Sequence, residues 1–143
     1  FEEIPQNVFS SGADILQKGV HDTSITSLKY NSKRMGHIYV SWLHPFKEHR
    51  LVIVGSKGMI RFEDAENTKP LTFYNKSVDL EGDLLKSKSD GIFEIEYSKE
   101  SPLEAQLKYF VSNMNGKIKK ANGDSAVDVM KILELATKSL TSN

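Results

Sequence analysis

The side chains best suited to chemistry gather around Pro45. Aromatic rings stack on the apolar face of a sugar, and basic groups pair with phosphate oxygens, so a mixture of the two favours a sugar or phosphate ligand. A solvated turn at a sheet edge, with one packed tryptophan, would show the same composition. Phe46 belongs to the same group, and the substrate-binding candidates are Trp42, His44, Lys47, His49 and Arg50.

Motifs for catalysis or for metal binding are absent from the sequence. None of the four histidines belongs to an H-x-x-x-H pair, and His44, Glu48 and His49 around one turn would make an incomplete ligand set. The run Gly55-Ser-Lys-Gly58 predicts a hairpin, because a phosphate loop would need a helix after it. Neither G-x-G-x-x-G nor G-x-S-x-G occurs. We therefore predict no catalytic, cofactor-binding or metal-binding residue in this chain.

Composition limits the class of protein. A chain of 143 residues predicts a single domain, residues 1–143, with a true core. The 19 basic and 19 acidic side chains cancel, so neither nucleic acid nor a membrane surface is an expected partner. Cysteine is absent, which excludes disulfides and thiolate sites. With no long apolar run and no signal peptide, we expect a cytoplasmic protein.

Periodicity predicts strands over the first two thirds of the chain. Residues 35–62 favour three consecutive antiparallel strands, with alternating apolar residues before Pro45 and an aliphatic run at 51–54. The polar, glycine-marked stretch 75–91 predicts a long, mobile loop. Further strands are expected at residues 6–11, 22–30, 71–74 and 93–97.

Two helices are predicted to follow the strands. Ser101, Pro102 and Glu104 form a helix start with a capping box, and Gly116 ends that helix. Asn122-Gly-Asp124 opens the second helix, with Asp124 or Ser125 as its cap. Strands followed by helices predict an α+β fold. We expect a large, mostly antiparallel β-sheet with helices packed on one face and the other face free for oligomerisation.

Several of these segments together resemble the C-terminal domain of the Gfo/Idh/MocA oxidoreductases. They are Val40-Ser-Trp-Leu-x-Pro45, Arg50-Leu-Val-Ile-Val-Gly-Ser-Lys-Gly58-Met, Ser101-Pro-Leu-Glu and Asn122-Gly-Asp124. The order of elements from about residue 6 to residue 140 is similar to that of the family. The branch most similar is that of the nucleotide-sugar dehydrogenases, such as UDP-N-acetylglucosamine 3-dehydrogenase.

The resemblance implies a domain that is not catalytic alone. Family members bind NAD or NADP in an N-terminal Rossmann domain and transfer hydride to or from a sugar or nucleotide sugar. Their catalytic lysine lies in a Glu-Lys-Pro motif that this chain lacks. His21-Asp22 falls just before a strand, away from the place of the family's catalytic pair. His44 and Phe46 replace the family's usual acidic residue and arginine around the proline.

The resemblance therefore implies a C-terminal substrate-binding and oligomerisation domain. Its expected partners are a Rossmann domain in the full-length protein, a second copy bound through the open sheet face, and a sugar or nucleotide sugar. The alternative is a stand-alone, non-catalytic carbohydrate-binding or assembly module.

Overall fold

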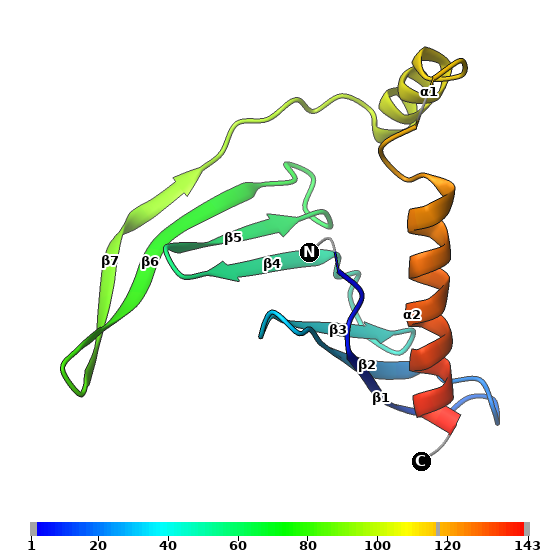
Figure 1. Cartoon of the computed structure of the whole chain (residues 1–143), viewed down its shortest axis with the longest axis horizontal. Coiled ribbons are helices and arrows are strands. Elements are labelled where there is room, and N and C mark those ends of the chain that lie inside the picture. The colour runs from blue at the N-terminus through cyan, green and yellow to red at the C-terminus, as the bar shows by residue number, and fades with distance from the viewer. Residues whose placement is uncertain (1–2, 117, 142–143) are drawn as a thin grey trace. The chain divides into compact units, whose positions relative to one another are not determined.

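The computed structural model describes residues 3–116 and 118–141 (Figure 1). Over these residues it contains seven strands and two helices, and every pairing of strands is antiparallel. The predicted α+β fold is confirmed. The described chain groups into two compact units, one built from the chain up to His44 and from Ala105 onward, the other from Pro45–Glu104.

The first unit contains a sheet of three strands, β1 (Asn7–Ala13), β2 (Thr23–Lys29) and β3 (Met35–Ser41), in that order. Branched residues give β2 its preference for extended backbone. Between β2 and β3 the chain reverses through a short turn, closed by the hydrogen bond from the Tyr30 amide to the Arg34 carbonyl. The strands predicted at residues 6–11 and 22–30 are confirmed.

Helix α2 (Gly123–Thr141) lies against β1 in this unit (Figure 1). Ser139 Oγ accepts a hydrogen bond from the Ser10 amide at 2.9 Å, which joins the last turns of the helix to the first strand. The helix cap is Asn122, whose Oδ1 accepts from the Ser125 amide at 2.9 Å. The prediction of Asp124 or Ser125 as cap was therefore wrong, because the helix begins before either residue.

Helix α1 (Pro102–Ser112) begins at the predicted proline and ends before the predicted Gly116. Turns follow Ser112, with the Gly116 amide donating to the Asn113 carbonyl at 3.0 Å. The Tyr109 hydroxyl accepts hydrogen bonds from the amides of Lys119 and Lys120 at 3.1 and 3.0 Å. No residue of α1 is buried. Neither described helix is long and apolar enough to cross a membrane.

The second unit contains a sheet of four strands in sequence order, β4 (Arg50–Gly55), β5 (Gly58–Glu63), β6 (Leu71–Glu81) and β7 (Leu84–Glu94). β3 and β4 belong to different sheets, so the prediction of three consecutive paired strands over residues 35–62 holds only for β4 and β5. The segment between β3 and β4 forms no hairpin, because Pro45 within it has no amide to give to a ladder.

β6 and β7 form a long hairpin where the sequence predicted a mobile loop over 75–91. A two-residue turn joins Glu81 to Leu84, and Gly82 adopts a φ of 63° there, as such turns require. Cross-strand ion pairs stabilise the hairpin, one between Asp79 and Lys88 and one between Glu81 and Lys86. The loop prediction was wrong because the residues that form these ion pairs are charged. Charged residues weaken the apolar pattern from which a strand is predicted.

The register gives the second sheet two unlike faces. One, the apolar face, carries only apolar side chains over the part of the sheet where all four strands lie side by side: Leu51, Ile53, Ile60, Phe62, Leu71, Phe73 and Phe93. The opposite one, the charged face, mixes apolar and ionisable side chains: Arg50, Val52, Val54, Met59, Arg61, Glu63, Thr72, Tyr74, Ile92 and Glu94. Residues directly opposite in antiparallel strands share a face, so these sets follow from the pairing alone.

Candidate ligand-binding site

The predicted binding residues are divided between the two units. Trp42 and His44 belong to the first unit. The Trp42 side chain is 89% exposed, while its amide donates to the Asp22 carbonyl at 2.8 Å. The His44 ring meets the Tyr39 ring edge-on, with centroids 6.2 Å apart. Lys47, His49 and Arg50 belong to the second unit, where the structure brings them near one another.

Three basic side chains surround Asp64, which follows β5. Lys69 Nζ lies 2.6 Å from Asp64 Oδ1, and His49 Nδ1 lies 3.8 Å from Oδ2. The hydrogen bond from Lys69 lowers the pKa of Asp64, and the nearby charges of Lys69, His49 and Lys47 lower it further. The same hydrogen bond raises the pKa of Lys69. These four residues, the Asp64 cluster, carry more positive groups than negative ones.

The Asp64 cluster is held in place by the backbone. The Asp64 amide donates to the His49 carbonyl at 2.8 Å, which extends the pairing of β4 and β5 by one step. The Lys69 amide donates to the Glu66 carbonyl at 3.0 Å, closing the turn that returns Lys69 toward Asp64. The cluster therefore sits on a sheet end rather than on an unsupported loop, which favours a fixed geometry.

Arg50 lies beside this cluster but serves another carboxylate. Its Nε is 2.5 Å from Glu63 Oε2, and the Glu63 side chain is only 4% exposed. This hydrogen bond raises the pKa of Arg50. Arg50, which was predicted to contact a ligand, therefore already pairs with a buried carboxylate. The sequence pattern did not indicate this pair.

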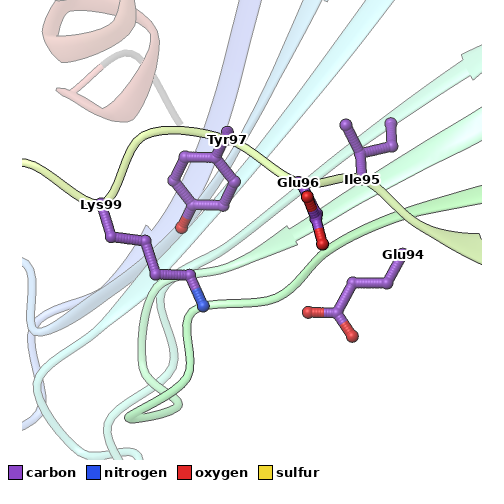
Figure 2. A pocket seen from close by; sticks show the side chains of 5 residues that line it. All are labelled: Glu94, Ile95, Glu96, Tyr97 and Lys99. Carbon is purple, nitrogen blue, oxygen red and sulfur yellow. The ribbon is translucent and has the colours of Figure 1, made fainter.

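A hollow of about 450 Å³ lies along the segment after β7. Figure 2 shows the polar ends of Glu96, Tyr97 and Lys99 on one side of the chain and Ile95 on the other. The Tyr97 hydroxyl donates to the Lys69 carbonyl at 2.7 Å, so the hollow adjoins the turn that carries Lys69. The lining residues are Glu94, Ile95, Glu96, Tyr97 and Lys99.

The arrangement suits a polar, anionic ligand. Lysine and histidine side chains of the Asp64 cluster can pair with phosphate oxygens, and carboxylates beside the hollow can accept hydrogen bonds from hydroxyl groups. Among the described residues, no group of three or more side chains has the composition and geometry of a metal site. Sequence analysis missed Asp64 and Lys69, because only the β5–β6 turn brings them to His49. It also missed Tyr97 and Lys99, which follow β7 and reach the site only through the fold of the second sheet.

One comparison with known proteins found a match. The family model described as the GFO/IDH/MocA C-terminal domain matches residues 1–61, which cover β1 to β4 and most of β5. Neither the curated proteins nor the solved structures contain a match. The match covers 61 of the 143 residues, less than half of the chain.

Proposed function

We propose that this chain is the C-terminal substrate-binding and oligomerisation domain of an NAD(P)-dependent sugar or nucleotide-sugar dehydrogenase. The observation that carries the proposal is the Asp64 cluster beside the Tyr97 hollow. The family match supports the oxidoreductase part of the assignment. In this proposal NAD or NADP binds to a Rossmann domain outside these residues, and the enzyme works in the cytoplasm.

The ligand's two parts would use different groups. The diphosphate of a nucleotide sugar would lie against Lys47, His49 and Lys69, where cations outnumber carboxylates. The sugar hydroxyls would donate to Glu94 or Glu96, and Tyr97 would pack against the ring. This chain contributes binding and orientation, and the hydride transfer belongs to the cofactor held elsewhere.

Calorimetric titration of the chain with UDP-sugars, UDP and NAD tests the substrate proposal. We expect a UDP-sugar and UDP to bind and NAD to give no heat. Lys69→Gln should weaken binding by about tenfold, equivalent to ~1.4 kcal/mol. Lys131→Gln, on α2 in the other unit, is the matched control and should bind as the wild type does. No heat from any nucleotide would contradict the proposal.

Exposed sheet faces support the oligomerisation part. Large apolar side chains on both faces of the second sheet are at least half exposed, among them Leu51, Val52, Ile53, Val54 and Phe93. Contiguous exposed apolar surface usually marks association, and most oligomers are symmetric copies of one chain. Sedimentation velocity at about 1 to 100 micromolar, the range of moderate affinities, tests this part. A single monomer species throughout would contradict it.

A stand-alone carbohydrate-binding module is the second candidate, favoured by the exposed Trp42. An indole that is 89% exposed offers a flat face on which a sugar ring can stack. Trp42 is the only tryptophan, so its fluorescence reports directly on this site. Neutral oligosaccharides that change the fluorescence, with UDP producing no heat, would favour this candidate over the dehydrogenase domain.

A further inference from the structure

Asp64 has one carboxylate oxygen with acceptor capacity to spare. Lys69 Nζ lies 2.6 Å from Oδ1 and donates a hydrogen bond to this side chain. Among the described residues, the ion-pair partner of Oδ2 is His49, whose Nδ1 lies 3.8 Å away, beyond the length of a hydrogen bond. An ionised carboxylate offers about four acceptor positions on its two oxygens. Oδ2 can therefore accept a hydrogen bond from a ligand.

This oxygen is accessible and held in a fixed place. The side chains of Asp64, Lys69 and His49 are 39%, 46% and 58% exposed. The backbone beneath them is ordered, because the Asp64 amide donates to the His49 carbonyl at 2.8 Å where the pairing of β4 and β5 ends. A ligand that reaches the cations of the Asp64 cluster therefore meets the carboxylate as well.

The charge of Asp64 restricts what a ligand can place beside Oδ2. The hydrogen bond from Lys69 lowers the pKa of Asp64, so the carboxylate is ionised at neutral pH. A phosphate oxygen beside Oδ2 would meet a like charge. A hydroxyl group would instead donate a charge-assisted hydrogen bond, which is about twice as strong as a neutral one. The cluster thus combines cations for phosphate with one acceptor for a hydroxyl.

The ribose of a nucleotide supplies hydroxyl groups next to phosphates. In the proposed function the diphosphate lies against Lys47, His49 and Lys69, and the sugar hydroxyls donate to Glu94 or Glu96. The ribose is joined to the opposite end of the same diphosphate, so it extends away from that sugar. In dinucleotide-binding sites, too, an acidic side chain accepts a hydrogen bond from a ribose hydroxyl.

The contacts within the second unit follow the same order as the parts of such a ligand. The Tyr97 hydroxyl, at the hollow, donates to the Lys69 carbonyl at 2.7 Å. Lys69 Nζ reaches Asp64 Oδ1, and Oδ2 lies on the side of His49. A ligand with its sugar in the hollow and a phosphate on Lys69 would bring its ribose to Oδ2.

We infer that Asp64 accepts a hydrogen bond from a ribose hydroxyl of a nucleoside diphosphate through Oδ2, and so selects nucleotides with an intact ribose. The inference rests on the proposed function and names a specificity-determining residue within it. Asp64 then acts on a nucleotide in two opposite ways. It binds the ribose hydroxyl, and it competes with the phosphates for Lys69.

Calorimetric titration of the chain with UDP, 2′-deoxy-UDP and 3′-deoxy-UDP tests the inference. The wild type should bind UDP at least about tenfold more tightly than one or both deoxy analogues, because the lost hydroxyl leaves a charged acceptor unpaired. In Asp64→Ala all three nucleotides should bind within about threefold of one another. Asp128→Ala, which removes an aspartate paired with Lys131 on α2, is the matched control and should keep the wild-type ratios.

Pyrophosphate separates the two effects of Asp64, because it has the phosphates but no ribose. Asp64→Ala frees Lys69 from its counter-ion, so pyrophosphate should bind about threefold more tightly, while UDP should bind about threefold more weakly. A loss of affinity for both ligands would show that Asp64 only positions Lys69 and would overturn the inference. Asp64→Asn keeps the size of the side chain and should shift the ratios in the same direction if Asp64→Ala does not fold.

The outcomes separate this inference from the proposed function. UDP binding that both deoxy analogues match within about threefold would overturn the ribose contact and leave nucleotide-sugar binding standing. Discrimination that survives Asp64→Ala would assign the ribose to another residue and would also overturn the inference. No heat from any nucleotide would overturn the ribose contact and the substrate proposal together.

Discussion

Arg50 Nε lies 2.5 Å from Glu63 Oε2, and the two side chains differ sharply in exposure. Half of the arginine side chain reaches solvent, whereas the glutamate side chain is 4% exposed. The buried partner depends on the exposed one, because water can solvate Arg50 if Glu63 is lost but cannot solvate Glu63 if Arg50 is lost. Because of this asymmetry, the loss of one partner should change the free energy of unfolding differently from the loss of the other, which is not expected of most surface ion pairs.

Arg50→Met should therefore destabilise the second unit more than Glu63→Gln does. The first change leaves a buried carboxylate without its cation, and the second leaves a partly exposed cation that water can solvate. Urea unfolding at neutral pH, monitored by circular dichroism, gives the two losses in free energy of unfolding. The double variant should lose less than the sum of the single losses. Equal losses for the two single variants would contradict the assigned asymmetry.

The Asp64–Lys69 pair predicts a defined dependence of stability on pH. Lys69 lowers the pKa of Asp64 in the folded chain. The stabilisation of the folded chain by Asp64 is therefore fully present above its unfolded pKa of about 3.9 and is lost as the pH falls through its folded pKa. Asp64 raises the pKa of Lys69, so that contribution is present below about pH 10.4 and is lost as pH rises through the folded value.

Asp64→Asn should consequently be less stable than the wild type near pH 7, and the difference should be smaller near pH 2, because the Asp64 carboxyl is protonated to a greater extent there. Both side chains are partly exposed, so the difference should be modest and should shrink in high salt. Thermal unfolding at the two pH values, with and without added salt, provides the measurement. A difference that persists unchanged in acid would show that Asp64 acts through something other than its charge.

Gly58 is required by the ring of Phe73. A Cβ at Gly58 would lie 2.4 Å from Cε2 of Phe73, too close for the sheet to accept without movement. Gly58→Ala should therefore cost about 1–3 kcal/mol of stability through overpacking. Gly58→Ala/Phe73→Leu should recover part of that loss, because leucine has no atoms at the position of the distant ring edge. Chemical denaturation of both variants would show whether the ring is the obstacle.

Asn122 should stabilise α2 as its N-cap. Its Oδ1 accepts the Ser125 amide at 2.9 Å, so Asn122→Ala should cost about 1 kcal/mol. Asn122→Asp keeps an acceptor at the same place and should remain close to the wild type. Guanidinium unfolding, monitored by the helical signal at 222 nm, separates the two variants. Equal stability of the alanine and aspartate variants would exclude a capping role.

Local chemistry explains which elements could be predicted. Branched residues in β2 and the proline at the start of α1 act through their own backbone preferences, and the structure confirms both elements. The β6–β7 hairpin depends instead on pairs such as Asp79 with Lys88, which meet only after the strands have aligned. A pattern search along one strand does not detect stabilisation that comes from its neighbour.

The candidate site shows the same division. Lys47 and His49 were recognisable because they adjoin aromatic residues around Pro45. Asp64 and Lys69 come to them through a turn whose geometry depends on the pairing of β5 with β6, and Tyr97 arrives from beyond β7. Residues close in sequence could therefore be predicted as candidates, whereas the carboxylate at their centre could not.

The bond between Ser10 and Ser139 has a consequence for synthesis on the ribosome. The strand that α2 covers is translated near the start of this chain, and the helix near its end. At about 5–20 residues per second, the ribosome would leave the β1–β2–β3 sheet uncovered for several seconds after its strands have emerged. Nascent chains would thus expose this sheet to chaperones or to one another until the helix is made.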